Sequence, residues 1–445
     1  MYLRTVIFFN LSMSTFIPIK GIVPVDSFYC PTSFTPLRIE SKCLNPNLFK
    51  KIMLKINRII LTLFAITIIS IGVLGFTPSQ ATPSSVPDNY IIILKDGANP
   101  WSVANEMAQQ RGLGISHVYG TAVNGFSAVV PKGQLDKITS DPRVKYVEQD
   151  SIITIFKKPS GTPGGGGEST TQPPQVTPTG IARIGGPVSG SVNVDVAVID
   201  TGIDPTHPDL NVISGVNFAK GKSWADGNGH GTHVAGTIAA KNNDIGVVGV
   251  APDARLYAVR VLDNRGSGFT SDVIAGVDWV AANANTIEVA NMSLGGSQSS
   301  ALNTAVENAV NAGVVFVVAA GNESTDACSK SPASAPNAIT VSALDDRDGV
   351  SNNDPFASFS NYGSCVDVIA PGVLILSTWK DGGYNTISGT SMASPHVAGA
   401  AALYLASYPT DMPAQVVSAI QSAGNLDWNV STDPDGNHEK LVHIP

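Results

Sequence analysis

Charged side chains are scarce in this sequence, making up 14% of its 445 residues against 43% hydrophobic residues. A chain of this length and composition buries a sizeable core and divides into two or three folded units, which excludes a disordered chain. Basic residues are scarcer still from Gln175 onward, where 11 lysines and arginines face 25 aspartates and glutamates. This acidic balance argues against nucleic acid as a partner and suits a protein that holds cations.

Long apolar runs are also lacking, with one exception. Lys55 and Arg58 precede an apolar run over 59–76, and small and polar residues follow at 79–81. This layout predicts a signal peptide over 53–81 and a secreted product. The run is close to the shortest length that spans a bilayer, so an uncleaved membrane anchor over 59–76 is the alternative, and no later segment could span.

The hydrophobic residues of 1–52 show no sustained helical or strand periodicity, and we assign this segment no function. We predict that translation starts at Met53 and that 1–52 is an unexplained extension of the assigned start, a genuine N-terminal extension being the alternative.

A small α+β domain is predicted over 86–156. Strands are expected at 90–94, 125–130 and 144–148, with helices around 103–110 and before the last strand. This order suggests a ferredoxin-like β-α-β-β-α-β unit. A flexible linker rich in Gly, Pro, Ser and Thr follows at 157–174.

The remainder, 175–445, is predicted to be an α/β domain. Short β-branched runs at 194–199, 256–261, 289–292 and 314–319 alternate with Ala-rich helical stretches. Strands that are buried on both faces have continuous apolar runs of this kind, so we expect a doubly wound, mostly parallel sheet with helices on both faces.

Three motifs in this domain carry reactive side chains. Asp200 lies at the carboxyl end of an apolar run that we expect to be a buried parallel strand, and open α/β sheets carry their functional sites at these strand ends. A turn or helix-cap aspartate is the alternative. His230 and His233 lie three apart among small residues, but no third ligand or adjacent Glu supports a zinc site. Ser391 begins an Ala-rich helix, where backbone N–H groups and the helix dipole favour developing negative charge.

Taken together, Asp200-Thr201-Gly202, His230-Gly231-Thr232-His233 and Gly389-Thr390-Ser391-Met392-Ala393 resemble the three catalytic boxes of the subtilase family, in the family's order. The resemblance covers 175–445 and implies a serine endopeptidase with Ser391 as nucleophile, His230 as general base and acid, and Asp200 as orienting carboxylate. It also implies that His233, Ser394 and His396 are structural.

The resemblance implies further site residues. Asn322 takes the oxyanion-hole position, with a turn asparagine as the alternative. Substrate is expected to add a strand between two edges, which are Gly266, Ser267 and Gly268 on one side and Ser293, Leu294 and Gly295 on the other. Ser293 to Gly295 is also compatible with a core strand.

Residues 86–156 resemble the subtilase propeptide, which assists folding and then inhibits. The resemblance implies cleavage after Phe156, with residues 153–156 in the four subsites before the scissile bond and a preference for large apolar residues at the first and fourth. The linker 157–174 departs from the pattern of subtilisins, in which the propeptide runs directly into the catalytic domain.

A calcium site is implied by the resemblance of 241–247 to a subtilisin loop, an Asn-rich surface turn being the alternative. The expected ligands are the side chains of Gln175, Asp209 and Asn243 and the carbonyls of Lys241, Ile245 and Val247. Cys328 and Cys365, the cysteines that follow the signal peptide, resemble the disulfide pair of the aqualysin-like branch, two free thiols being the alternative.

The sequence thus predicts a secreted, autoprocessed zymogen, acting on proteins and peptides of broad sequence, inhibited by its own propeptide and monomeric. The alternatives are an inactive binding or scaffold protein of the same fold and a membrane-tethered processing protease. No triad member is missing, and no acidic cluster matches dibasic substrates.

Overall fold

The structure is a computed structural model that describes residues 85–155, 172–351 and 353–444. The predicted signal peptide over 53–81, the N-terminal extension over 1–52 and Phe156 lie outside the described residues, as does most of the 157–174 linker.

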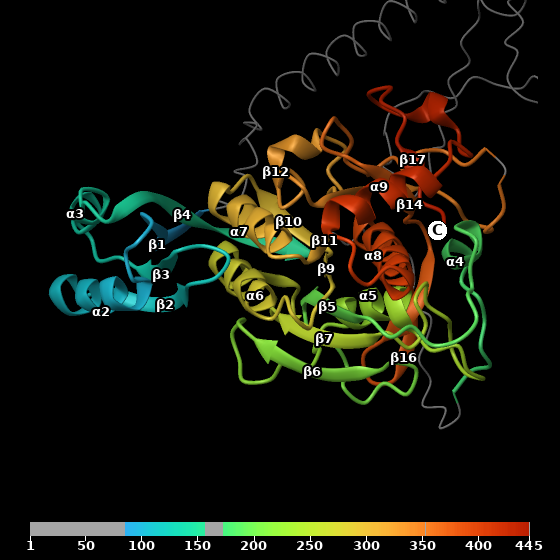
Figure 1. Ribbon diagram of the computed structural model, residues 1–445, viewed down its shortest axis with the longest axis horizontal. Coiled ribbons are helices and arrows are strands. Elements are labelled where there is room, and N and C mark those ends of the chain that lie inside the picture. Colours follow the sequence, from blue (N-terminus) through green and yellow to red (C-terminus); the bar gives the residue numbers. More distant parts are fainter. Residues whose placement is uncertain (1–84, 156–171, 352, 445) are drawn as a thin grey trace, which may run out of the picture. The chain divides into compact units, whose positions relative to one another are not determined.

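The first folded region contains four strands and two helices in the predicted β-α-β-β-α-β order (Figure 1). Its elements are β1 (Ser85–Leu94), α2 (Pro100–Arg111), β2 (Gly114–Tyr119), β3 (Gly125–Val129), α3 (Leu135–Thr139) and β4 (Val144–Ile155). The strands pair antiparallel in the order β4-β1-β3-β2. Ile92, Met107 and Phe126 belong to its buried core.

Helix α2 shows how local sequence sets an element's limits. Asn99 accepts a hydrogen bond from the Ser102 N–H at 2.9 Å, and Pro100 follows at the first helical position. Gly112 ends the helix with a φ of 71°, a left-handed conformation that glycine adopts without steric cost.

The second region is built on a parallel sheet of eight strands in the order β17-β14-β13-β11-β9-β5-β7-β6. Each neighbouring pair runs parallel, which confirms the predicted fold class. Its strands are β5 (Asp195–Asp200), β6 (Val212–Asn217), β7 (Arg255–Arg260), β9 (Val289–Met292), β11 (Val315–Ala319), β13 (Ile339–Leu344), β14 (Val368–Pro371) and β17 (Lys440–Leu441).

Helices cover both faces of this sheet because its central strands are apolar on both sides. Along β5, Val196 and Val198 join the core that contains α5 (His230–Ala239) and α8 (Thr390–Ser407). Ala197 and Ile199 point to the opposite face and join the core with α6 (Thr270–Ala282) and α7 (Ser300–Asn311). This alternation explains the continuous β-branched run in the sequence.

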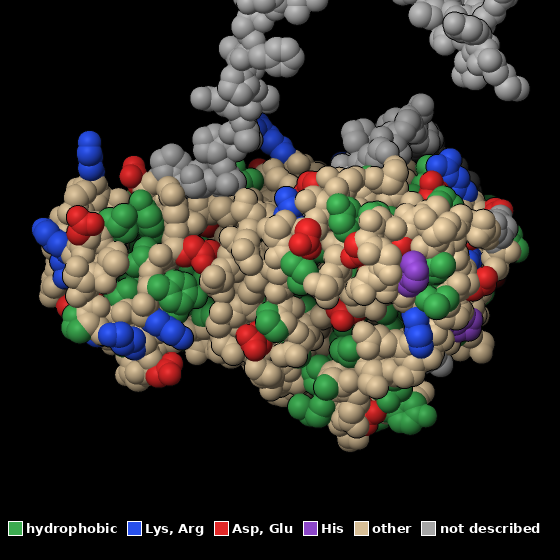
Figure 2. All heavy atoms as spheres, turned by 90° about the horizontal axis from the view of Figure 1, so that it is seen from above, with side chains coloured by type: hydrophobic (Ala, Val, Ile, Leu, Met, Phe, Trp, Pro, Cys, Tyr) green, Lys and Arg blue, Asp and Glu red, His purple; other side chains and the backbone are tan. Residues whose placement is uncertain are grey.

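The remaining elements lie outside the eight-stranded parallel sheet. They are α4 (Thr179–Arg183), β8 (Ser267–Phe269), β10 (Leu294–Ser297), β12 (Lys330–Ser331), the hairpin of β15 (Ile375–Trp379) and β16 (Gly383–Ile387), α9 (Pro413–Ala423) and two short 3-10 helices, Ala327–Ser329 and Val430–Thr432. On the face drawn in Figure 2, acidic and basic side chains are dispersed among polar and backbone atoms. Among the described residues, no helix is both long and apolar enough to cross a membrane.

Candidate active site

The carboxylate of Asp200 and the imidazole of His230 form a buried pair. Asp200 is the last residue of β5 and His230 the first of α5, and both side chains are fully buried. The His230 Nδ1 lies 2.8 and 3.0 Å from the two Asp200 carboxylate oxygens. The Thr201 N–H also donates to Asp200 Oδ1, at 2.7 Å. This pair fixes the orientation of the imidazole ring. The other ring nitrogen, Nε2, is buried and has no hydrogen-bond partner in the described part of the chain.

Asp226 organises the start of the histidine helix, and the sequence analysis did not identify it. Its Oδ1 accepts hydrogen bonds from Thr201 Oγ1 at 3.0 Å and from the Gly229 N–H at 2.8 Å. Its Oδ2 accepts from Thr232 Oγ1 at 2.7 Å and from the Thr232 N–H at 3.0 Å. Asp226 therefore links the residue after Asp200 to the first turn of α5. A carboxylate four residues before a histidine was the only sequence signal.

Ser391 is the second residue of α8, which begins directly after Gly389. Its Oγ donates to the Ser293 carbonyl at 3.0 Å, while Ser293 Oγ donates back to the Ser391 carbonyl at 2.8 Å. The structure therefore places the serine hydroxyl against Ser293, and within the described residues the Nε2 of His230 accepts no hydrogen bond from it.

Asn322 follows β11 and lies beside the start of α8. Its Oδ1 accepts the Thr390 N–H at 3.0 Å and Thr390 Oγ1 at 2.9 Å. The preceding Gly321 has a φ of 108° and donates its N–H to Thr390 Oγ1 at 3.1 Å. Because Thr390 holds the amide oxygen, the NH₂ group of Asn322 points away from Thr390.

The end of β4 occupies the space between the two predicted substrate edges. Thr154 pairs with Ser267 on one side and with Gly295 on the other. Ile153 is fully buried in the core beneath this strand. Strand β4 was predicted to end at 148 but continues to Ile155, because its last residues pair with β8 and β10 (Figure 1).

The predicted substrate-binding residues therefore flank one strand. Gly266, Ser267 and Gly268 lie at or beside β8, and Ser293, Leu294 and Gly295 lie at or beside β10. The Ile155 N–H donates to the Gly266 carbonyl at 3.0 Å. A side chain at Gly266 would collide with Ile155, since an added Cβ would lie 2.6 Å from its Cδ1.

The other polar residues of the motifs have structural contacts. His233 Nε2 lies 3.0 Å from the Ile375 carbonyl, and burial lowers the pKa of His233 to about 3. His396 Nδ1 lies 2.8 Å from the Met392 carbonyl, and burial lowers the pKa of His396 to about 4. Ser394 Oγ donates to Asn291 Oδ1 at 2.6 Å. The two histidines are therefore held neutral at physiological pH.

The side chains predicted to bind calcium converge at the 241–247 loop. Gln175 Oε1 accepts the Asn243 N–H at 2.5 Å, and Asn243 Nδ2 donates to Asp209 Oδ1 at 2.9 Å. The Val247 N–H donates to Asp209 Oδ2 at 3.0 Å. Asp209 is fully buried, and burial raises the pKa of its carboxyl. Asp209 thus accepts N–H groups of the loop, and a buried carboxylate beside the amide side chains of Gln175 and Asn243 offers the oxygen ligands that a hard cation such as calcium prefers.

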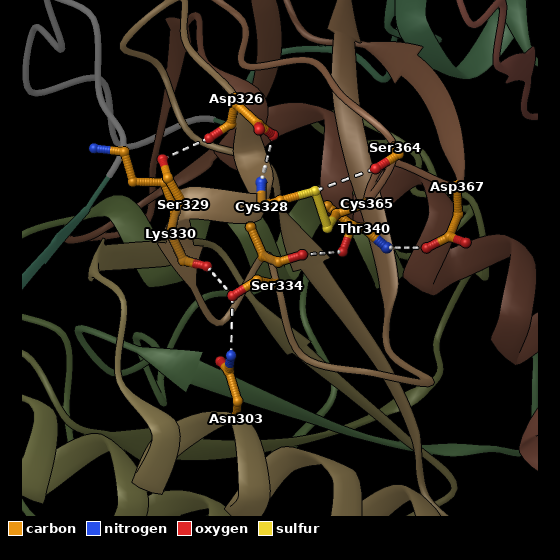
Figure 3. The surroundings of a disulfide bond; sticks show 11 residues. Asn303, Asp326, Cys328, Ser329, Lys330, Ser334, Thr340, Ser364, Cys365 and Asp367 are labelled. Carbon is orange, nitrogen blue, oxygen red and sulfur yellow. Dashed lines mark hydrogen bonds between the residues drawn. A yellow bond between two sulfur atoms is a disulfide. The ribbon is translucent and has the colours of Figure 1, made fainter.

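Cys328 and Cys365 form a disulfide, as predicted, with their Cα atoms 5.4 Å apart (Figure 3). Near the bond, the Cys328 N–H donates to Asp326 Oδ1 at 2.9 Å, and the Thr340 N–H donates to Asp367 Oδ2 at 2.8 Å. The bond closes a loop of 37 residues that contains β12 and β13.

Comparison with known proteins identifies the family. The profile described as "Subtilase family" matches residues 191–437, and the profile described as "Peptidase inhibitor I9" matches residues 89–156. Subtilisin amylosacchariticus from Bacillus subtilis subsp. amylosacchariticus is 42% identical over 382 residues, which cover 82% of this chain and 93% of that protein. An extracellular serine proteinase from Thermus sp. (strain Rt41A) is 42% identical over 366 residues, covering 76% of this chain and 85% of that protein.

A solved structure agrees with these relatives. The crystal structure of a cold adapted subtilisin-like serine proteinase is 44% identical in sequence and superimposes with a TM-score of 0.54, covering 60% of this chain and 98% of that chain. The chain belongs to the subtilase family: it is a subtilisin-like serine endopeptidase, a hydrolase, preceded by an inhibitory propeptide domain.

Proposed function

We propose that the protein hydrolyses peptide bonds through an acyl-enzyme formed on Ser391, with His230 as base and Asp200 as its orienting group. The observation that carries this proposal is the buried Asp200–His230 pair, with distances of 2.8 and 3.0 Å to Nδ1. A carboxylate on Nδ1 holds the proton there, so that Nε2 is the basic nitrogen.

In the proposed reaction, the Ser391 hydroxyl rotates away from the Ser293 carbonyl toward His230 Nε2. The imidazole takes the hydroxyl proton while Oγ attacks the scissile carbonyl, and it then donates that proton to the leaving amine. Water hydrolyses the resulting ester by the same route. Catalytic hydrogen bonds often form only when substrate is bound. The hydrogen bond from Ser391 to the Ser293 carbonyl is therefore compatible with these reaction steps.

The tetrahedral oxyanion is proposed to be stabilised by the Ser391 N–H and the Asn322 side-chain amide. Thr390 supports this role because its N–H and hydroxyl hold the Asn322 oxygen at 3.0 and 2.9 Å. The dipole of α8, which begins one residue before Ser391, favours the same negative charge. In subtilisin itself, loss of this amide donor lowers kcat by about 10²–10³-fold.

The propeptide is proposed to end at Phe156, which is cut from its successor by the enzyme itself. Support comes from the backbone pairing of 153–155 with β8 and β10, the geometry expected of a substrate strand. Ile153 is fully buried at the fourth position before the proposed bond. We therefore propose a preference for large apolar residues at the first and fourth positions. N-terminal sequencing that found Phe156 still joined to its successor would refute the cleavage site.

A structural calcium ion is proposed at the 241–247 loop. The side chains of Gln175, Asp209 and Asn243 would hold it, together with the carbonyls of Lys241, Ile245 and Val247. When bound, the ion would supply positive charge to the buried Asp209 carboxylate and cross-link the loop to the segment around Gln175.

We further propose that the enzyme is secreted as a monomeric zymogen, with 53–81 as the signal peptide. The relative from Thermus sp. is named as extracellular, which supports this location. Detection of the enzyme in the membrane fraction with 59–76 attached would instead favour the anchored form.

The test compares three versions of the precursor expressed from Met53 with calcium: wild type, Ser391→Ala and Ser394→Ala. Ser394 lies one turn further along the same helix, which makes it a matched serine control. We expect wild type and Ser394→Ala to mature and digest casein, and Ser391→Ala to remain an uncut precursor with activity lowered by about 10⁴-fold or more. Equal processing and casein digestion by Ser391→Ala would refute the triad and favour an unrelated site.

A further inference from the structure

Three aspartates lie together in the segment that follows β13, and we call them the Asp346 cluster: Asp346, Asp348 and Asp354. Each presents one carboxylate oxygen, and the three oxygens all lie within 4.8 Å of one another. Asp348 and Asp354 also line a cavity of about 320 Å³ at the surface. Oxygens at this spacing are close enough to contact one ion, and the cavity gives it a path to solvent.

The side chain of Asp346 is fully buried and one of its oxygens lacks a donor. Oδ1 accepts the N–H groups of Asp348 at 3.1 Å and Gly349 at 2.8 Å. Oδ2 is buried without a hydrogen bond in the described part of the chain, and its nearest cation, the Arg183 Nε, is 3.5 Å away. A buried carboxylate oxygen without a donor is unfavourable unless a cation approaches it.

Arg183 does not neutralise the carboxylates around it. Its Nε donates to Asp354 Oδ2 at 3.2 Å, and its Nη1 lies 3.6 Å from Asp427 Oδ2. One guanidinium therefore serves Asp427 and the whole Asp346 cluster, so these four carboxylates and Arg183 together carry a formal net charge of −3. A bound divalent cation would reduce this excess to one.

We propose that the Asp346 cluster binds a calcium ion, separate from the ion proposed at the 241–247 loop. All three protein ligands are carboxylate oxygens, which suit hard cations rather than zinc or copper. Calcium accepts irregular shells of six to eight oxygens, so solvent in the open cavity can complete the coordination. The inference is independent of the catalytic roles proposed above.

The test counts calcium ions on the full Ser391→Ala precursor, which cannot digest itself if the triad is correct. Calcium is removed with a chelator and then titrated by equilibrium dialysis. In Asp348→Asn, an isosteric change at an exposed residue, we expect one calcium ion fewer per chain or an affinity at least about ten-fold lower at one site. Asp381→Asn is the control: Asp381 is an exposed aspartate on the β15–β16 hairpin that pairs with Lys380 and does not line this cavity, and we expect parental binding.

A companion variant separates the two proposed sites. Asp209→Asn should lower binding at the 241–247 loop alone, and the Asp209→Asn, Asp348→Asn double variant should lose both ions. Parental stoichiometry and affinity in Asp348→Asn would overturn the proposal, whatever Asp209→Asn does.

A second measurement needs no change in the cluster and therefore does not depend on a folded variant. Amide hydrogen exchange is followed in the Asp209→Asn precursor with and without calcium. We expect calcium to slow exchange at least about ten-fold at Asp348 and Gly349, whose N–H groups donate to Asp346. Identical exchange rates in both conditions would mean that Arg183 alone holds the cluster, and would overturn the proposal.

Discussion

Asp278 on α6 is predicted to hold the propeptide on the enzyme. Its carboxylate accepts three backbone N–H groups of the propeptide, from Gly120 at 3.2 Å, Thr121 at 2.8 Å and Ala122 at 2.7 Å. Hydrogen bonds to a charged acceptor contribute about 1.5–3 kcal/mol each, and partial exposure of Asp278 reduces this to about 1 kcal/mol. Asp278→Ala should therefore weaken propeptide binding by about 3 kcal/mol, or roughly 150-fold.

The assay is inhibition of the mature enzyme by separately produced propeptide, with hydrolysis of a peptide substrate as the readout. We expect the inhibition constant to rise roughly 150-fold in Asp278→Ala. We expect kcat/KM to stay at the wild-type value, because Asp278 does not line the substrate edges. Asp381→Ala is the control, since its side chain is 84% exposed on the β15–β16 hairpin. A rise of less than about three-fold would refute the reasoning.

Three further predictions concern stability, measured by denaturant unfolding of the Ser391→Ala precursor. His233 has a pKa of about 3, so only the unfolded state takes up its proton as pH falls below about 6.5. The parent therefore loses unfolding free energy between pH 7 and pH 4, and this loss should be about 3 kcal/mol smaller in His233→Gln. In the control His443→Gln, changed at an exposed site, the loss should equal that of the parent. Equal losses in His233→Gln and the parent would contradict this prediction. Replacing Cys328 and Cys365 by serine, which opens a loop of 37 residues, should lower the unfolding free energy by about 3–4 kcal/mol, whereas a change below about 1 kcal/mol would contradict it. A chelator should destabilise the parent, and Asp209→Asn should reduce that effect; an undiminished effect would place the calcium elsewhere.

Much of the fold could be predicted because the signals are local. The run over 194–199 is apolar on both faces of β5, which indicates a buried parallel strand without knowledge of its neighbours. The catalytic motifs could be read for the same reason, since each is a short segment at the end of a strand or the start of a helix.

The parts that were missed depend on distant partners. Strand β2 was not identified from its sequence, because within it only Tyr119 is buried. The second half of β4 is a strand because β8 and β10 flank it, not because of its own periodicity. The sequence analysis did not identify the acidic segment after β13, since Arg183 and Asp354 are 171 residues apart in sequence.

The central claim is that Ser391 is the nucleophile activated by His230. Diisopropyl fluorophosphate reacts with activated serines, so the mature enzyme is treated with it and the modified peptide is identified by mass spectrometry. We predict one adduct, on Ser391, with activity lost in proportion to labelling, and no adduct in a His230→Ala protein matured by added wild-type enzyme. An adduct on another serine, or full activity with Ser391 completely labelled, would contradict the account.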